Sequence, residues 1–112
     1  MNYTLQKIGD VNIVTVELVE ASLSQSDDFK KYIYSLTEGG ARKVVLDLGK
    51  VLYMDSSFIG ALVAGLKHLL TNQGEMALAN IGSDVLALFE LTRLDKVFHV
   101  YDSVDDAVKS FD

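Results

Sequence analysis

Residues 43–63 read Lys-Val-Val-Leu-Asp-Leu-Gly-Lys-Val-Leu-Tyr-Met-Asp-Ser-Ser-Phe-Ile-Gly-Ala-Leu-Val, and they carry the strongest indication of the fold. Residues 44–48 are apolar except for Asp47 and are β-branched at two positions, which predicts a strand covered on both faces. From Ser56 the apolar residues take helical spacing, which predicts a helix to about Leu70. The stretch therefore indicates a buried strand that turns into a helix, as in α/β proteins.

Segments on both sides of this stretch alternate between strand and helix patterns. Strands are predicted at residues 13–19, with 3–8 as a hairpin partner, at 76–79 and at 97–101. Helices are predicted around Phe29, Ile33 and Leu36 with a stop at Gly39-Gly40, at 84–91, and at 104–111 with Ser103 and Asp106 in a capping pattern. This order predicts an α/β sandwich with a largely parallel or mixed sheet.

Length and composition limit the possible functions. A chain of 112 residues suits one domain that buries roughly two-thirds of its extended surface. The net charge of −6 argues against a nucleic-acid groove and favours a partner with a basic face. The chain has no cysteine, and its longest apolar run, residues 58–66, is shorter than the ~20 residues that span a bilayer. We expect a cytoplasmic protein that contacts neither membrane nor nucleic acid directly.

Residues suited to catalysis or metal binding are few. His68 and His99 lie far apart in the sequence, and no cysteine or carboxylate pattern completes a metal site around them. No phosphate-binding glycine loop and no nucleophile elbow is present. Asp47, near a strand end, would suit the acceptor of a receiver-like domain, but the acidic pair and late lysine of that class are missing. We expect no catalytic residue, no metal and no cofactor.

Asp55, Ser56 and Ser57 stand where the predicted helix begins. An aspartate in this position caps the first free N–H groups, and the positive end of the helix favours anions. A phosphate on either serine would be stabilised there, and spacing alone does not separate Ser56 from Ser57. Helix capping without any modification is the simpler interpretation of the same residues.

The helix that follows has no polar side chain from Phe58 to Leu66. Either both of its sides are buried within the domain, or one side meets a partner. Small residues at 60, 61, 64 and 65 would allow close packing in the first case. The sequence leaves the two alternatives open.

Two motifs in this order and spacing resemble the STAS family, the bacterial anti-sigma-factor antagonists. The first is Val44-Val45-Leu46-Asp47-Leu48 leading to Met54-Asp55-Ser56-Ser57, and the second is residues 88–98, Leu-Phe-Glu-Leu-Thr-Arg-Leu-Asp-Lys-Val-Phe. The resemblance extends from about Ile13 to Phe111. It implies a single STAS-like domain over residues 1–112, with a mixed sheet and alternating helices packed mainly on one face.

The same resemblance implies a partner switch. The unphosphorylated chain would capture an anti-sigma factor that has histidine-kinase-like serine kinase activity, Ser56 would be the phosphoacceptor, and a PP2C-type phosphatase would reset it. The chain would be a monomer or weak homodimer and no enzyme. The implied partner-binding residues are Ser22, Asp55, Ser57, Phe58, Ile59 and Gly60. The alternatives are a non-switching STAS scaffold or small-ligand sensor, and an independent enzyme for which no residue set suggests a reaction.

The sequence departs from the family pattern at two positions. Many relatives have glycine where Phe58 stands, so we expect this aromatic residue to alter the surface next to the acceptor and to restrict which kinase fits. An earlier loop often carries Gly-x-Leu-Asp, with the aspartate close to the acceptor. Residues 19–23 occupy that place here, and Ser22 is the nearest match to the aspartate.

Overall fold

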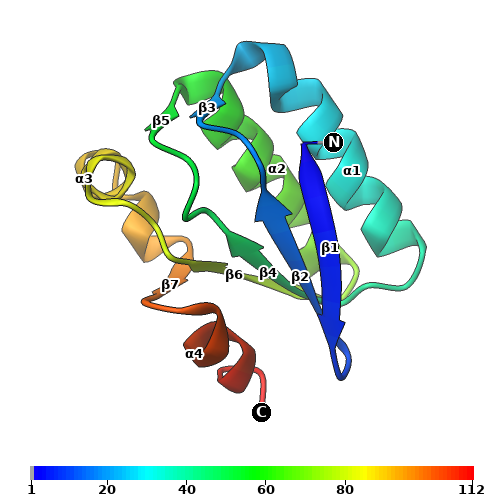
Figure 1. The fold of residues 1–112 in the computed structure, drawn as a ribbon. Coiled ribbons are helices and arrows are strands. Elements are labelled where there is room, and N and C mark those ends of the chain that lie inside the picture. Colours follow the sequence, from blue (N-terminus) through cyan, green and yellow to red (C-terminus); the bar gives the residue numbers. More distant parts are fainter. Residues whose placement is uncertain (1) are drawn as a thin grey trace.

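The computed structural model describes residues 2–112 (Figure 1). The elements in chain order are β1 (Tyr3–Ile8), β2 (Val11–Val16), β3 (Glu20–Ala21), α1 (Leu23–Glu38), β4 (Lys43–Asp47), β5 (Tyr53–Met54), α2 (Ser56–Thr71), β6 (Glu75–Ala79), α3 (Ser83–Leu91), the 3₁₀-helix η1 (Leu94–Lys96), β7 (His99–Tyr101) and α4 (Val104–Lys109).

The main sheet has five strands in the order β1-β2-β4-β6-β7. β1 pairs antiparallel with β2 through a tight hairpin, and all other neighbours are parallel. The sheet is therefore mixed, as predicted. Because parallel strands end at the same edge of a sheet, the connections that follow β2, β4 and β6 all leave from one end of the molecule.

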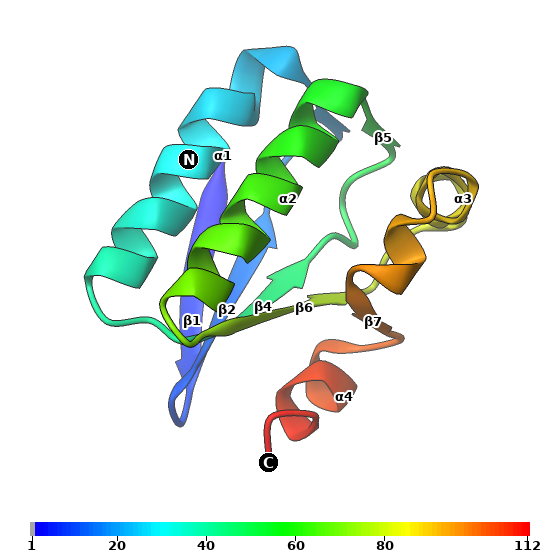
Figure 2. The same ribbon diagram turned by 180° about the vertical axis from the view of Figure 1, so that it is seen from behind.

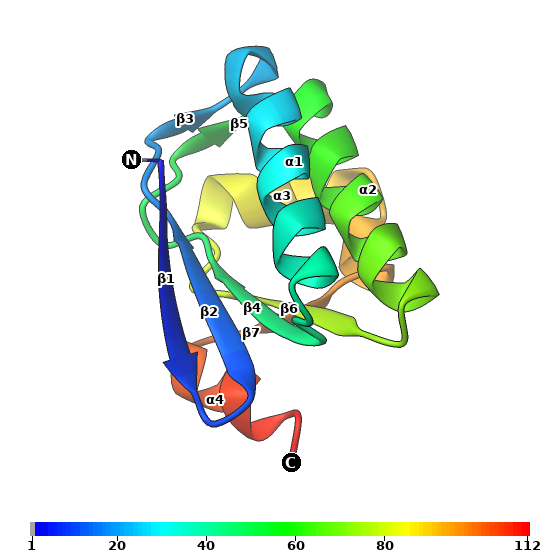
Figure 3. The same cartoon turned by 90° about the vertical axis from the view of Figure 1, so that its right-hand side faces the viewer.

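A second, two-stranded sheet lies at that end, where β3 pairs parallel with β5. No pattern in the sequence predicts it. Each strand has only two residues, which is too short to show the period-two alternation from which strands are recognised. Its effect is large, because it holds the starts of α1 and α2 side by side (Figure 3).

The helices cover the main sheet unequally (Figure 2). α1 and α2 lie side by side on one face, and α3 joins the same core through Val85 and Phe89. Among the described residues, only those of α4 form a helix on the opposite face, where Val104 and Val108 pack against Ile13 and other sheet residues. The prediction that helices pack mainly on one face is confirmed.

Aromatic residues occupy the centre of the larger core. Phe29 of α1 and Phe58 of α2 are fully buried, and their ring centroids lie 4.9 Å apart. Tyr3 closes the cluster from β1, with its ring 5.6 Å from that of Phe29. Burial of each large side chain contributes about 2 kcal/mol or more, so this cluster holds α1 and α2 together and against β1.

Several predicted boundaries differ from the structure. The strand predicted to reach Val19 ends at Val16, because β4 ends at Asp47 opposite Thr15 and offers no partner beyond it. Val19 is 59% exposed as a result. At the other edge, Val97 caps η1 rather than starting a strand, and β7 begins at His99.

The C-terminal ends of α1 and α2 use glycine for different reasons. Gly40 has a φ of 108°, which confirms the predicted glycine stop after α1. After α2 the left-handed position falls on Gln73, with a φ of 61°. Gly74 is needed for space instead, because a Cβ there would lie 2.7 Å from the carbonyl oxygen of Arg42.

Candidate functional site

The starts of α1 and α2 form a joint site because β3 and β5 run parallel. Ala21 pairs with Met54, so the next residues on each chain segment, Ser22 and Asp55, become neighbouring helix caps. The backbone N–H of Asp55 also donates to the carbonyl oxygen of Ala21 at 3.1 Å. Segments more than thirty positions apart in sequence therefore enter their helices from one short sheet.

The carboxylate of Asp55 joins the two helices directly. Its Oδ1 accepts a hydrogen bond from the backbone N–H of Phe58 at 3.0 Å, which caps α2 as the sequence predicts. Its Oδ2 accepts a second bond, also at 3.0 Å, from the backbone N–H of Leu23, the first residue of α1. Sequence spacing gave no signal for this second bond. One side chain thus fixes the relative position of both helix starts.

Ser22 fixes the start of α1 from the other side. The side-chain oxygen of Gln25 accepts hydrogen bonds from the backbone N–H of Ser22 at 3.0 Å and from its hydroxyl at 3.1 Å. Ser22 is half-buried and directly precedes Leu23, which is bonded to Asp55. The structure therefore brings Ser22 and Asp55 into the same part of the surface.

Ser56 and Ser57 differ in exposure. Ser56 is the first residue of α2, is exposed, and makes no side-chain hydrogen bond to any residue of the described chain. Ser57 is half-buried and lies in a groove of about 290 Å³ between α1 and α2. The groove is lined by Leu23, Ser26, Asp27, Lys30, Ser57, Gly60, Ala61 and Ala64. Access by another protein is therefore easier at Ser56.

Phe58 lies away from the surface. The prediction that this aromatic residue alters the surface beside the acceptor is wrong, because its side chain is fully buried against Phe29. Helical geometry explains this, since position 58 faces the core together with Leu62, Leu66 and Leu69. Any effect of Phe58 on a partner must pass through the position of α2.

The two sides of the apolar helix α2 have different roles. A Cβ at Gly65 would lie 3.2 Å from Cγ2 of Ile33, so this glycine allows close packing of α2 on α1. Gly60 is exposed, and a Cβ there would meet nothing within 4 Å. Close packing explains Gly65, but it does not explain Gly60, which is exposed and has no neighbour in reach of a side chain.

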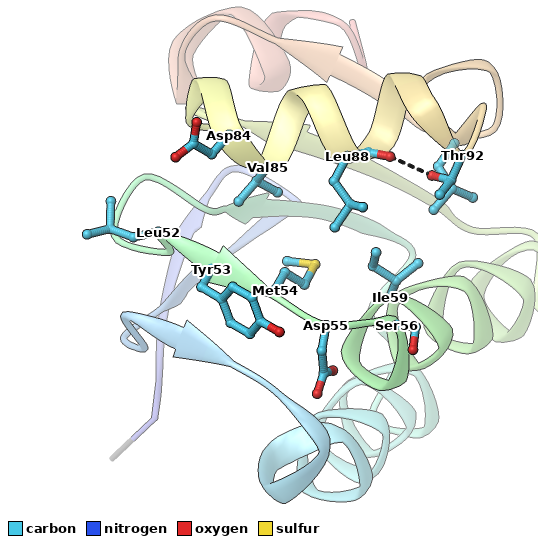
Figure 4. Close-up of a pocket in the computed structure, with 11 residues that line it drawn as sticks. Leu52, Tyr53, Met54, Asp55, Ser56, Ile59, Asp84, Val85, Leu88 and Thr92 are labelled. Carbon is cyan, nitrogen blue, oxygen red and sulfur yellow. Dashed lines mark hydrogen bonds between the residues drawn. The ribbon is translucent and has the colours of Figure 1, made fainter.

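A larger groove of about 680 Å³ lies on the other side of Ser56 (Figure 4). Val85 and Leu88 point from α3 toward β5, and Ile59 points toward them from α2. No pattern in the sequence predicts this groove, because its walls come from separate segments. The lining residues are Leu52, Tyr53, Met54, Asp55, Ser56, Ile59, Asp84, Val85, Leu88, Thr92 and Leu94.

The shifted titratable groups lie outside this site. Burial, with a smaller effect of the Asp28 charge, raises the pKa of Tyr3 to about 12. A hydrogen bond from Lys43 lowers the pKa of Asp10, and bonds from Lys50 and Thr4 lower that of Glu17.

Within residues 2–112 no group of three or more potential metal ligands gathers, and no helix is long and apolar enough to cross a bilayer.

Comparison with known proteins places this geometry in a family. The STAS domain profile matches residues 3–107. The chain belongs to the STAS family. An anti-sigma-B factor antagonist of Staphylococcus aureus is 27% identical over 103 residues, which cover 92% of this chain and 86% of the relative. STAS anti-sigma antagonists are regulatory binding proteins, and the resemblance of the two sequence motifs is confirmed.

Solved structures share the fold over nearly the whole chain. A Thermotoga maritima protein described as a candidate anti-sigma factor antagonist superimposes with a TM-score of 0.86 at 25% identity, covering 96% of this chain and 92% of its own. The Bacillus cell fate determinant SpoIIAA in its phosphorylated form gives a TM-score of 0.74 at 15% identity, covering 98% and 99%. The latter similarity shows the fold alone.

Proposed function

We propose that this STAS domain is a phosphorylation-switched anti-sigma-factor antagonist. Its unmodified form captures an anti-sigma factor that acts as a histidine-kinase-like serine kinase, and Ser56 receives the phosphate. The observation that carries the proposal is the exposed, unbonded hydroxyl of Ser56 at the first position of α2. The antagonist named among the relatives supports the choice of partner.

The proposed binding surface surrounds Ser56. Its exposed or half-buried members come from both helix starts, and Phe58 supports them from beneath. Open space around Gly60 would let a partner side chain approach the α2 backbone closely. The surface consists of Ser22, Asp55, Ser57, Ile59 and Gly60.

A phosphate on Ser56 would act through local charge. It adds about −1.5 to −2 next to Asp55, in a chain whose net charge is already −6. A partner that packs on this surface would have to bury that charge, which is costly without a matching cation. The N-terminus of α2 stabilises the same charge in the free protein, so the partner is released without a change of fold. A PP2C-type phosphatase would then reset Ser56.

The test is phosphorylation followed by intact mass measurement. The protein is incubated with ATP and the serine kinases of its own organism that resemble anti-sigma factors. We expect a gain of one phosphate that is lost in Ser56→Ala and kept in the matched control Ser57→Ala. A phosphate that persists in Ser56→Ala, or no gain with any of these kinases, contradicts the proposal.

A second candidate function is a non-switching scaffold or small-ligand sensor. The groove of about 680 Å³ beside α3 favours it, because small-molecule sites usually have volumes in this range. Absence of phosphorylation together with ligand binding in this groove would select the sensor.

We propose that residues 1–112 act as one STAS unit, as a monomer or weak homodimer. The proposed compartment is the cytoplasm, where sigma factors and their regulators act.

A further inference from the structure

The groove between α3 and β5 has apolar walls. Met54, Ile59, Val85, Leu88 and Leu94 are among its lining residues, and Val85 and Leu88 face Ile59 across it. Its volume of about 680 Å³ lies within the ~300–1,000 Å³ typical of small-molecule sites. An apolar chain or ring would therefore lose its contact with water there.

The charge of the lining residues indicates which polar head group such a ligand would carry. Asp55 and Asp84 are acidic, and no lysine, arginine or histidine is among the lining residues. The N-terminal ends of α2 and α3 each carry about +0.5 charge, which is smaller than the full negative charge of each carboxylate. The groove therefore disfavours an anionic ligand and favours a cation.

Asp84 is the carboxylate that is free to meet a cation. Both oxygens of Asp55 accept hydrogen bonds from helix N–H groups, and its side chain points toward α1 (Figure 4). Asp84 is exposed in the first turn of α3, and its carboxylate has no hydrogen-bond or ion-pair partner within residues 2–112.

We propose that this groove binds a small organic cation, with an apolar tail between α3 and β5 and an ammonium head near Asp84 at the rim. This inference goes beyond the partner switch, because it requires neither a kinase nor a phosphate. Ser56 lines the same groove, so ligand and phosphate would influence each other.

The test compares three probes of equal chain length and different head charge. Octyltrimethylammonium, octanol and octanoate are titrated separately into the unmodified protein, and amide chemical shifts give the site and the dissociation constant. We expect shifts at Met54, Val85 and Leu88, and binding of the ammonium probe about fivefold tighter than octanoate, as for one exposed charge pair. This preference should shrink at high salt.

Matched variants separate the groove from the rest of α3. Leu88→Trp fills the groove and should remove binding, whereas Leu91→Trp changes a side chain that is 82% exposed outside it and should not. Asp84→Asn should reduce the preference for the ammonium probe over octanol, and Ser56→Glu should increase it. Thermal unfolding confirms that each variant is folded.

Three outcomes overturn the inference. Octanoate could bind as tightly as the ammonium probe, or the shifts could map to the opposite end of the domain. Failure of all three probes to bind would show that the groove does not take such a small molecule and would favour a protein segment as its occupant. Because the assay contains no kinase, these outcomes do not bear on the phosphorylation of Ser56.

Discussion

Asp55 connects two helices through one carboxylate, and its importance is only partly visible in the sequence. Its place before Ser56 predicts the cap on α2, which the bond from Phe58 confirms. The bond from Leu23 requires β3 and β5 to pair, and strands of two residues leave no pattern to detect. The burial of Phe58 was missed for a related reason, because a uniformly apolar helix does not show which side faces the core.

Replacement of Asp55 by alanine should lower the free energy of unfolding by about 2 kcal/mol. Two helix N–H groups lose a charged acceptor, and loss of a cap alone costs about 1 kcal/mol. Asp84→Ala is the matched control, since this carboxylate accepts no hydrogen bond within residues 2–112, and its cost should stay below about 1 kcal/mol. Urea unfolding measures both, and equal losses would contradict the bridging role.

Tyr3→Phe should alter the alkaline pH dependence of stability. Burial raises the pKa of Tyr3 to about 12, whereas the unfolded chain ionises near the ordinary value of 10.0. Between these values the unfolded state releases the proton first, so the free energy of unfolding falls as pH rises. Phenylalanine removes this contribution and also a buried hydroxyl with no partner within residues 2–112.

Urea unfolding of both proteins between about pH 9 and pH 11.5 tests this contribution. The stability advantage of Tyr3→Phe over the unmodified chain should grow with pH. Parallel curves for the two proteins would show that Tyr3 titrates normally in the folded state.

Element α2 shows how far sequence patterns extend. Its start, its apolar character and its stop near Gln73 are predictable from local signals. The division between its buried and exposed sides is not, because glycine occurs on both. Only the position of α1 decides that Gly65 packs against Ile33 while Gly60 faces open space.

The two glycines should respond oppositely to alanine. Gly60→Ala should raise the free energy of unfolding by about 0.5–1 kcal/mol, because alanine favours the helix and its Cβ has room. At Gly65 alanine has the same helix preference, but its Cβ would crowd Ile33, and this crowding lowers the free energy of unfolding. We expect Gly65→Ala to be less stable than Gly60→Ala by at least about 1 kcal/mol. Chemical unfolding measures the free energy of unfolding of both variants, and equal values would contradict this expectation.

At the scale of the molecule, the topology gathers the site at one end. Parallel strands direct the connections before α1, α2 and α3 to the same edge, whereas α4 lies on the other face of the sheet. Family motifs in the sequence predict the fold and suggest Ser56. They do not predict the grooves on either side of it, because Leu52 and Ile59 meet α3 only in three dimensions.

The phosphorylation switch is tested by the affinity of the anti-sigma factor for the unmodified and the fully Ser56-phosphorylated protein. Titration calorimetry gives both dissociation constants, and amide spectra of the two forms report the fold. We expect phosphorylation to weaken binding by more than about thirtyfold, because a charge would be buried without a partner, while the fold stays the same. Equal affinity of the two forms, or release that occurs only because the phosphorylated domain unfolds, would contradict it.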